Sequence, residues 1–146
     1  MIKTKKIITK SEKETLALGQ AFAKKITGGQ VLAFFGNLGA GKTVFIKGIA
    51  KGLGIKKIIT SPTFVLMKVY PIKNQKTGLK NLIHIDCYRT GDADQIKAIG
   101  ATEYFLRPDS LVVIEWAEKI KPLLPKKLIR IKITLQKDNS RQITIW

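Results

Sequence analysis

The sequence is poor in cysteine, in long apolar runs and in acidic residues. Cys87 is the only cysteine among the 146 residues, which excludes a framework of disulfide bonds. The longest run of aliphatic and aromatic residues covers only 31–35, far short of the ~20 residues that a membrane-spanning helix needs. The basic first ten residues lack the apolar stretch of a secretory signal peptide. We therefore expect a cytoplasmic chain without membrane association, forming one domain over residues 1–146.

Acidic residues number 10 against 27 lysines and arginines, which gives a formal net charge of +17. Only four of the basic residues are arginines, namely Arg89, Arg107, Arg130 and Arg141. Specific recognition of phosphates and bases relies on the arginine fork, whereas lysine acts as a hydrated point charge. Two interpretations therefore stay open: long-range attraction to a polyanion such as nucleic acid, or a solvated lysine-rich surface with no specific partner.

Hydrophobic periodicity predicts the order strand, helix, strand, helix and then several strands. Ser11, with Glu14 three residues later, forms a capping-box pattern that begins the first helix. A second amphipathic helix follows a glycine-rich turn, and a short one covers 92–99. The expected strands are residues 5–9, 31–35, 64–72, 79–86, 111–115, 129–135 and 142–146. This order favours an α/β fold, in which a mixed sheet carries antiparallel strands at the C-terminus.

One motif carries chemistry, the string Gly36-Asn37-Leu38-Gly39-Ala40-Gly41-Lys42-Thr43. It fits the P-loop pattern G-x-x-x-x-G-K-[ST], and it lies between an apolar strand and an amphipathic helix as that loop requires. The glycines let consecutive backbone N–H groups point at phosphate oxygens, and the start of the helix adds its positive dipole end. Lys42 is expected to reach the β- and γ-phosphates, and the Thr43 hydroxyl to hold Mg²⁺.

A P-loop needs a carboxylate at the end of another strand to organise Mg²⁺. Two candidates follow apolar strands, Asp86 and Glu115. A carboxylate at a strand end is also typical of turns and caps, so the residues alone leave both open. The spacing of Gly36, Gly39 and Gly41 does not fit the G-x-G-x-x-G pattern of a Rossmann dinucleotide site.

Five strings together resemble one family, the bacterial TsaE (YjeE) family of small P-loop ATPases required for threonylcarbamoyladenosine in tRNA. They are Gly36–Thr43, Ser61-Pro62-Thr63-Phe64, His84-Ile85-Asp86-Cys87-Tyr88-Arg89, Gly100-Ala101-Thr102-Glu103-Tyr104-Phe105 and Val113-Ile114-Glu115-Trp116. Their order and spacing make the resemblance far more specific than the P-loop alone. It covers residues 15–116, and it implies a P-loop NTPase-like fold of three αβα layers.

The resemblance implies a role for individual residues. The P-loop would bind ATP, with Mg²⁺ on Thr43 and Glu115. Thr63 would sense the γ-phosphate, and Asp86 would be the catalytic carboxylate beside the attacking water. Trp116 would lie next to the nucleotide, and Thr15 would line the adenine side. Asn37 stands where the family usually has an acid, which puts partner contacts in doubt but not nucleotide binding.

The resemblance also implies partners, the TsaB–TsaD pair, with tRNA reached through that complex and no DNA expected. ATP hydrolysis would support transfer of a threonylcarbamoyl group to the adenosine next to the anticodon. Two alternatives stay open, a small-molecule kinase and a nucleotide-dependent binding switch with negligible turnover. A kinase is disfavoured because the chain is short and contains few arginines for a lid. His84 and Cys87 are expected to be buried structural groups.

Overall fold

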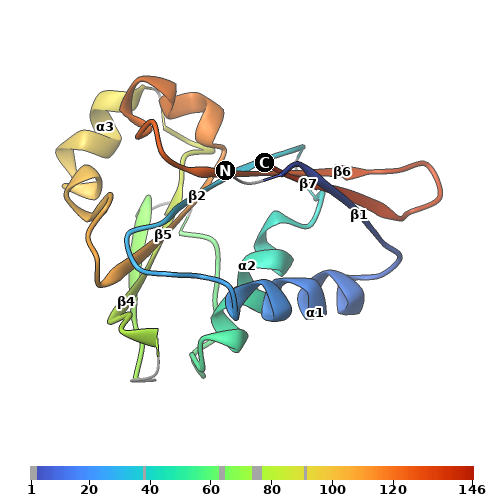
Figure 1. Ribbon diagram of the computed structural model, residues 1–146. Coiled ribbons are helices and arrows are strands. Elements are labelled where there is room, and N and C mark those ends of the chain that lie inside the picture. Colours follow the sequence, from blue (N-terminus) through green and yellow to red (C-terminus); the bar gives the residue numbers. More distant parts are fainter. Residues whose placement is uncertain (1–2, 38, 63–64, 74–76, 91) are drawn as a thin grey trace.

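A seven-stranded mixed sheet forms the centre of the protein (Figure 1). The computed structural model describes residues 3–37, 39–62, 65–73, 77–90 and 92–146. The strands are β1 (Lys5–Thr9), β2 (Val31–Phe35), β3 (Met67–Pro71), β4 (Asn81–Asp86), β5 (Ser110–Glu115), β6 (Ile129–Leu135) and β7 (Arg141–Ile145). The helices are α1 (Glu12–Ala23), α2 (Lys42–Gly52), α3 (Ala93–Ala98) and the 3₁₀ helices η2 (Ala101–Tyr104) and η3 (Ala117–Leu123).

The strand order is β1-β7-β6-β2-β5-β4-β3, and the sheet is parallel in its middle and antiparallel at both edges. Strands β6, β2, β5 and β4 pair in parallel. Strands β7 and β1 add antiparallel pairs at one edge, and β3 adds one at the other. The mixed sheet predicted from the sequence is confirmed. The last two strands form an antiparallel hairpin as expected, and β6 also joins β2 in parallel.

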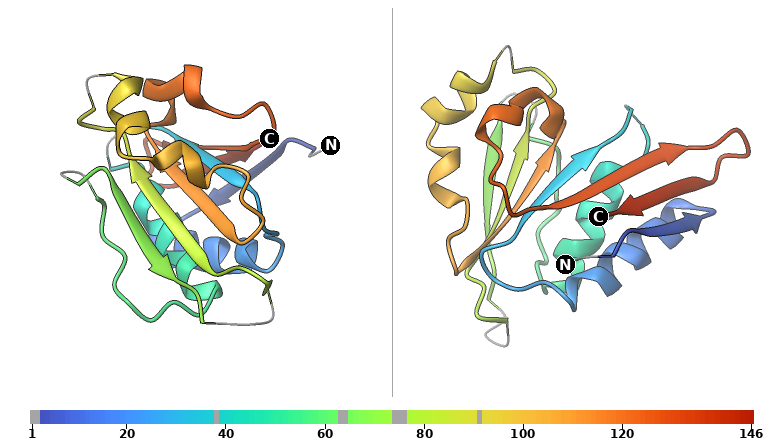
Figure 2. Two further views of the ribbon diagram at one scale, coloured as in Figure 1. Left: turned by 90° about the vertical axis from the view of Figure 1, so that its left-hand side faces the viewer. Right: turned by 45° about the horizontal axis from the view of Figure 1, so that its top comes forward.

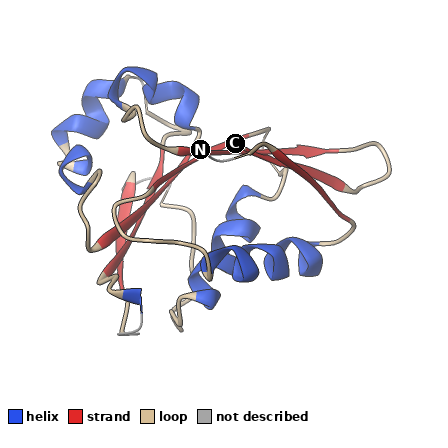
Figure 3. Ribbon diagram, in the orientation of Figure 1, coloured by secondary structure: helices blue, strands red, loops and turns tan. Residues whose placement is uncertain are grey.

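Helices cover both faces of the sheet, which confirms the three-layer arrangement (Figures 1 and 2). Helices α1 and α2 pack on one face, where the rings of Phe34 and Phe45 lie 5.7 Å apart between centroids. The short helices α3, η2 and η3 cover the other face, where Ile96 packs with Ile114 in a second apolar cluster (Figure 3). The residues of β2 from Val31 to Phe34 have no exposed surface, as expected for a parallel strand covered on both faces.

The capping signal that begins α1 acts as predicted, and the structure shows in addition how α1 packs on α2. The Ser11 hydroxyl accepts a hydrogen bond from the Glu14 amide at 3.1 Å, which caps α1. The Glu14 carboxylate accepts one from the Lys10 amide at 2.6 Å. A Cβ atom on Gly48 of α2 would overlap the Leu16 carbonyl oxygen of α1, so the two helices pack backbone against backbone. This packing fixes the start of α2 beside the start of α1.

Strands β3 and β4 form the predicted antiparallel hairpin. Its first strand begins at Met67, and residues 64 and 74–76 lie outside the described part of the chain. The sequence did not reveal η2 and η3, because four- and seven-residue helices are too short to show a helical period. None of the helices in the described ranges combines the length and the apolar character needed to cross a bilayer.

Candidate functional site

The predicted P-loop connects β2 to α2, and its glycines adopt conformations that other residues rarely take. Gly36, Gly39 and Gly41 have φ angles of 134°, 78° and 107°. The Ala40 amide donates to the Asn37 carbonyl at 3.1 Å, which closes the turn. Helix α2 begins immediately after Gly41, so its first N–H groups face the space enclosed by the loop. An anion placed there would meet backbone donors and the positive end of the helix dipole.

Lys42 places its ammonium group inside this loop. The residue is 5% exposed, and its Nζ atom donates to the carbonyl oxygens of Gly36 and Asn37. Nζ also lies 4.1 Å from the centre of the Trp116 ring. Burial lowers the pKa of Lys42 from its ordinary value, and the negative charges of Glu115 and other nearby carboxylates partly oppose that shift. An ammonium has three N–H donors, so two contacts with described residues leave one donor for a phosphate oxygen.

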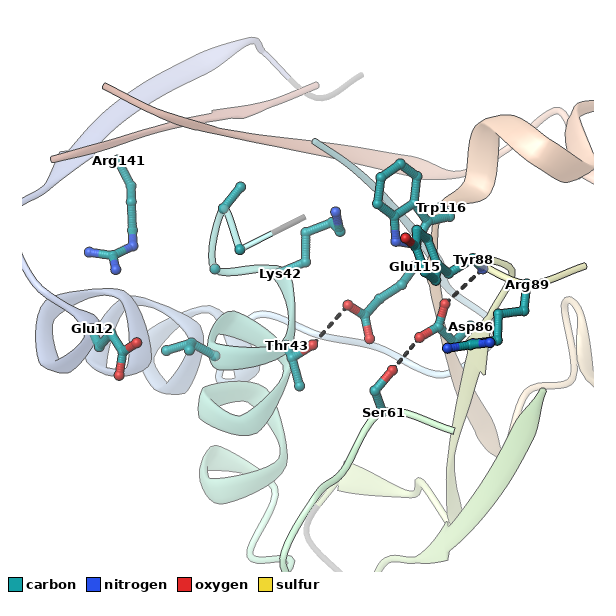
Figure 4. Close-up of a pocket in the computed structure, with 14 residues that line it drawn as sticks. Glu12, Lys42, Thr43, Ser61, Asp86, Tyr88, Arg89, Glu115, Trp116 and Arg141 are labelled. Carbon is teal, nitrogen blue, oxygen red and sulfur yellow. Dashed lines mark hydrogen bonds between the residues drawn. The ribbon is translucent and has the colours of Figure 1, made fainter. Parts of the chain in front are cut away.

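Thr43 and Glu115 meet across the gap between α2 and β5. The Thr43 hydroxyl donates to Glu115 Oε1 at 2.9 Å (Figure 4). The other carboxylate oxygen, Oε2, lies 2.7 Å from Nε2 of His84, and both of these side chains are buried. Hydroxyl and carboxylate oxygens are ligands that Mg²⁺ prefers. No group of three or more histidine, cysteine or acidic side chains suited to a metal occurs among the described residues, so phosphate oxygens and water would complete such a site.

Asp86 lies beside Glu115, because the two residues are direct neighbours in the register of β4 and β5. Asp86 is 4% exposed. Its Oδ1 accepts a hydrogen bond from the Tyr88 amide at 2.9 Å, and its Oδ2 accepts one from the Ser61 hydroxyl. Both carboxylates that the sequence proposed therefore lie side by side at the C-terminal ends of the neighbouring strands β4 and β5. Thr63, the expected sensor of the γ-phosphate, lies outside the described residues, as does Leu38.

Trp116 follows Glu115 in the left-handed conformation, with φ 58° and ψ 42°. This conformation is unusual for a bulky residue and is less favourable than the right-handed form by about 1–2 kcal/mol. It turns the indole toward Lys42 of the P-loop. The other neighbour of the indole is Tyr88, which follows β4, and the two ring centroids lie 5.1 Å apart. Backbone strain of this kind is concentrated at functional sites. The indole of Trp116 forms one wall of the space above Lys42, because its ring lies over the Lys42 ammonium.

These side chains enclose a cavity of about 390 Å³ (Figure 4). The lining residues are Glu12, Gly39, Ala40, Gly41, Lys42, Thr43, Val44, Ser61, Asp86, Tyr88, Arg89, Glu115, Trp116 and Arg141. The cavity brings together most of the residues that the sequence proposed. Glu12 and Arg141 were missed, because neither belongs to a motif and β7 is far from the P-loop in the sequence. The one available signal was that Arg141 is one of only four arginines.

Thr15 lies behind the loop and does not line the cavity. It is fully buried, and its hydroxyl is 2.7 Å from the hydroxyl of Thr9. Its nearest approach to the loop is toward Gly41, where a Cβ atom would be 3.9 Å from Thr15 Cγ2. A contact between Thr15 and a nucleotide stays a prediction. The residue of α1 that lines the cavity is Glu12.

Comparison with known proteins gives one consistent family. The family model described as "Threonylcarbamoyl adenosine biosynthesis protein TsaE" matches residues 9–143. A protein of Bacillus subtilis, named tRNA threonylcarbamoyladenosine biosynthesis protein TsaE, is 39% identical over 93% of this chain and 81% of its own. A protein of the same name from Treponema pallidum is 36% identical over 94% of this chain and 97% of its own. The crystal structure of Bacillus subtilis YdiB superposes with a TM-score of 0.78 and 35% identity, covering 99% of this chain and 86% of that one. The chain belongs to the TsaE family.

Proposed function

We propose that this protein takes part in the biosynthesis of threonylcarbamoyladenosine in tRNA by binding and hydrolysing ATP with Mg²⁺ in the cavity above the P-loop. The observation that carries the proposal is the 2.9 Å hydrogen bond between Thr43 and Glu115, which joins the P-loop helix to a neighbouring strand. A hydroxyl and a carboxylate at this distance can share one cation, and Lys42 lies alongside. The family relatives are named for the same biosynthesis, which supplies the biological setting.

We propose three roles for the residues of the site. The loop amides and Lys42 would hold the β- and γ-phosphates. Thr43 and Glu115 would hold Mg²⁺, which supplies neutralisation of the charge that develops on the phosphoryl oxygens. Asp86 would orient the attacking water and accept its proton. Since both carboxylates project from adjacent strand ends, the metal-holding and water-activating groups lie side by side.

Slow turnover in isolation follows from the surroundings of Asp86. Its Oδ2 is covered by the Ser61 hydroxyl, and its Oδ1 by the Tyr88 amide. Ser61 lies in the segment that leads to Thr63, so movement of this segment would uncover the carboxylate for water. A partner that binds there would stimulate hydrolysis. We propose the TsaB–TsaD pair as that partner, with tRNA reached through the complex and without a contribution of this chain to the new covalent bond.

Phosphate release with Mg²⁺-ATP, measured with and without TsaB–TsaD, tests the proposal. We expect slow release by the protein alone and faster release with the pair. Asp86→Asn should retain ATP binding but lower release at least about 100-fold, as expected for loss of a general base. Lys42→Ala should lower ATP affinity about 30-fold or more, because a charge-assisted contact with phosphate is lost. Lys47→Ala, an exposed lysine on the same helix, is the matched control and should behave as the wild type.

Each alternative gives a different result in these assays. ATP binding without phosphate release under any condition would contradict hydrolysis and support a binding switch. Appearance of a phosphorylated acceptor in place of free phosphate would support a kinase. Unchanged release by Asp86→Asn would contradict the role given to that carboxylate.

A further inference from the structure

A long stretch of the chain contains no acidic residue. Between Thr15 and Ile85 the sequence has eleven lysines and neither aspartate nor glutamate, and all ten acidic residues lie outside this stretch. The stretch includes most of α1, all of α2 and strand β3, so it forms the layer on one face of the sheet and the strand at one edge (Figure 1). The function proposed above uses only one of the eleven lysines, Lys42. The remaining positive charge of this layer has no role in it.

The two helices bring several of these lysines to one end of the molecule. A Cβ atom on Gly52, at the end of α2, would overlap Ala23, at the end of α1, so both helices end side by side (Figure 1). This end lies away from the P-loop, which precedes α2. The residues that follow α1, Lys24 and Lys25, are exposed there, as is Lys51 in the last turn of α2.

The segment after α2 adds two lysines and an open groove. Lys56 and Lys57 are exposed, and together with Lys51 they line a groove of about 580 Å³ whose lining includes no acidic residue. The next residue, Ile58, is 82% exposed, so no described part of the chain covers this segment. Lys51, Lys56 and Lys57 are called the lysine surface below. None of the three forms an ion pair within the described ranges.

The composition of the groove indicates which class of polyanion fits it. Interfaces between proteins are depleted in lysine and enriched in aromatic residues and arginine, and the groove is lined by lysines without an aromatic residue or an arginine. Lysine is a hydrated point charge, which suits contacts with nucleic-acid phosphates that do not depend on base sequence. The family relatives are named for a biosynthesis that takes place on tRNA. These observations favour RNA over an acidic protein.

We infer that the lysine surface binds the phosphate backbone of a folded RNA directly and without reading its bases. The function proposed above reaches tRNA through the partner complex, and this surface adds a contact made by the chain itself. The groove and the cavity above the P-loop share no lining residue, and they lie at opposite ends of α2. RNA on the lysine surface therefore leaves the cavity open, and its binding requires neither ATP nor hydrolysis.

Fluorescence anisotropy with a labelled, unmodified tRNA transcript tests this inference on the full chain without ATP, between 50 and 300 mM KCl. We expect the wild type to bind with a Kd of about 1–100 µM near physiological salt, as is usual for sequence-independent contacts. Each lost phosphate contact changes the slope of log affinity against log salt by about 0.7–0.9. The triple variant Lys51→Gln, Lys56→Gln, Lys57→Gln should therefore reduce the steepness of that slope by about 2–3 and lower affinity at least about 20-fold at 100 mM salt.

A second triple variant, Lys121→Gln, Lys126→Gln, Lys127→Gln, is the matched control. It removes the same charge from exposed lysines on and after η3, and it includes an adjacent pair like Lys56 and Lys57. We expect it to change tRNA affinity less than about threefold. Thermal unfolding verifies that both triple variants retain the fold.

Three results would overturn the inference. Equal losses of affinity in the two triple variants would show that only net charge matters, and a wild-type protein that does not bind tRNA at 50 mM salt would leave the surface without this ligand. Tighter binding to polyglutamate, or to vesicles of anionic lipid, than to tRNA would identify an acidic protein or a membrane surface as the occupant. A chain that hydrolyses ATP but does not bind tRNA refutes this inference alone, whereas one that binds tRNA but not ATP refutes the proposed function alone.

Discussion

The buried contact between His84 and Glu115 provides a test of how the carboxylate that we propose as a Mg²⁺ ligand is positioned. Nε2 of His84 lies 2.7 Å from Oε2 of Glu115, while Oε1 of the same carboxylate accepts the Thr43 hydroxyl. His84 has no exposed surface, and its other ring nitrogen, Nδ1, has no partner among the described residues. Two substitutions separate the contributions: His84→Leu removes the donor, and His84→Gln retains an N–H donor near the same place.

The expected magnitude follows from these contacts. A hydrogen bond to a charged group stabilises a protein by about 1.5–3 kcal/mol, and His84→Leu loses it. The leucine also removes the unpartnered Nδ1 atom, which returns about 1 kcal/mol. We therefore expect the free energy of unfolding of His84→Leu to fall by about 0.5–2 kcal/mol, which lowers the Tm by about 2–6 °C at this chain length. His84→Gln should lose about half as much.

The functional readout is the dependence of nucleotide binding on Mg²⁺. Residues that orient metal ligands typically change metal affinity 10- to 100-fold when they are replaced. His84→Leu should therefore raise the Mg²⁺ concentration needed for half-maximal ATP binding about tenfold, and it should leave metal-free ATP binding unchanged. A double-mutant cycle with Glu115→Gln, followed by urea unfolding, should give a coupling energy of about 1 kcal/mol or more. Wild-type Mg²⁺ dependence in His84→Leu, or a coupling energy near zero, would refute this reasoning.

Other substitutions test the rest of the site and its surroundings. Thr43→Val should lower ATP affinity about tenfold with Mg²⁺ and little without it, in calorimetric titrations, because it removes only the hydroxyl that we propose as a Mg²⁺ ligand. Gly41→Ala should lower the free energy of unfolding by about 1–3 kcal/mol in urea and abolish ATP binding, because its φ angle of 107° does not suit a side chain. Burial raises the pKa of Cys87 from 9.0 to about 12, so stability should fall as the pH rises from 9 toward 12, where only the unfolded thiol ionises. The same thiol should react with an aromatic disulfide at pH 8 only after denaturation.

The sequence predicts the part of the fold that follows from local periodicity. The apolar run 31–35 is β2 within the same bounds, and 5–9 and 129–135 are likewise strands as predicted. The Ser11 pattern places the start of α1 correctly because the capping interaction is local. The P-loop can be identified because its motif directly follows the apolar strand β2. The two carboxylates can be identified because each is the last residue of an apolar strand, β4 or β5.

Other features depend on contacts between distant segments, which no local pattern encodes. The left-handed conformation of Trp116 arises where β5 turns into η3, and a tryptophan carries no signal for it. Glu12 reads as an ordinary acidic residue in the first turn of a helix, since such residues stabilise the helix dipole. Arg141 reaches the cavity only because β7 pairs with both β6 and β1 at the edge of the sheet.

Strand register brings the two carboxylates of the candidate site together. Phe34 pairs with Glu115, and Glu115 pairs with Asp86, so the ends of three parallel strands lie level. Side chains alternate between the faces of a sheet, and both carboxylates point to the face covered by α2, like Leu82 and Val113 earlier on their strands. A slip of one residue in either pairing would turn the carboxylate to the opposite face, among the apolar side chains under α3. Burial of the alternate apolar residues therefore holds the carboxylates beside Thr43.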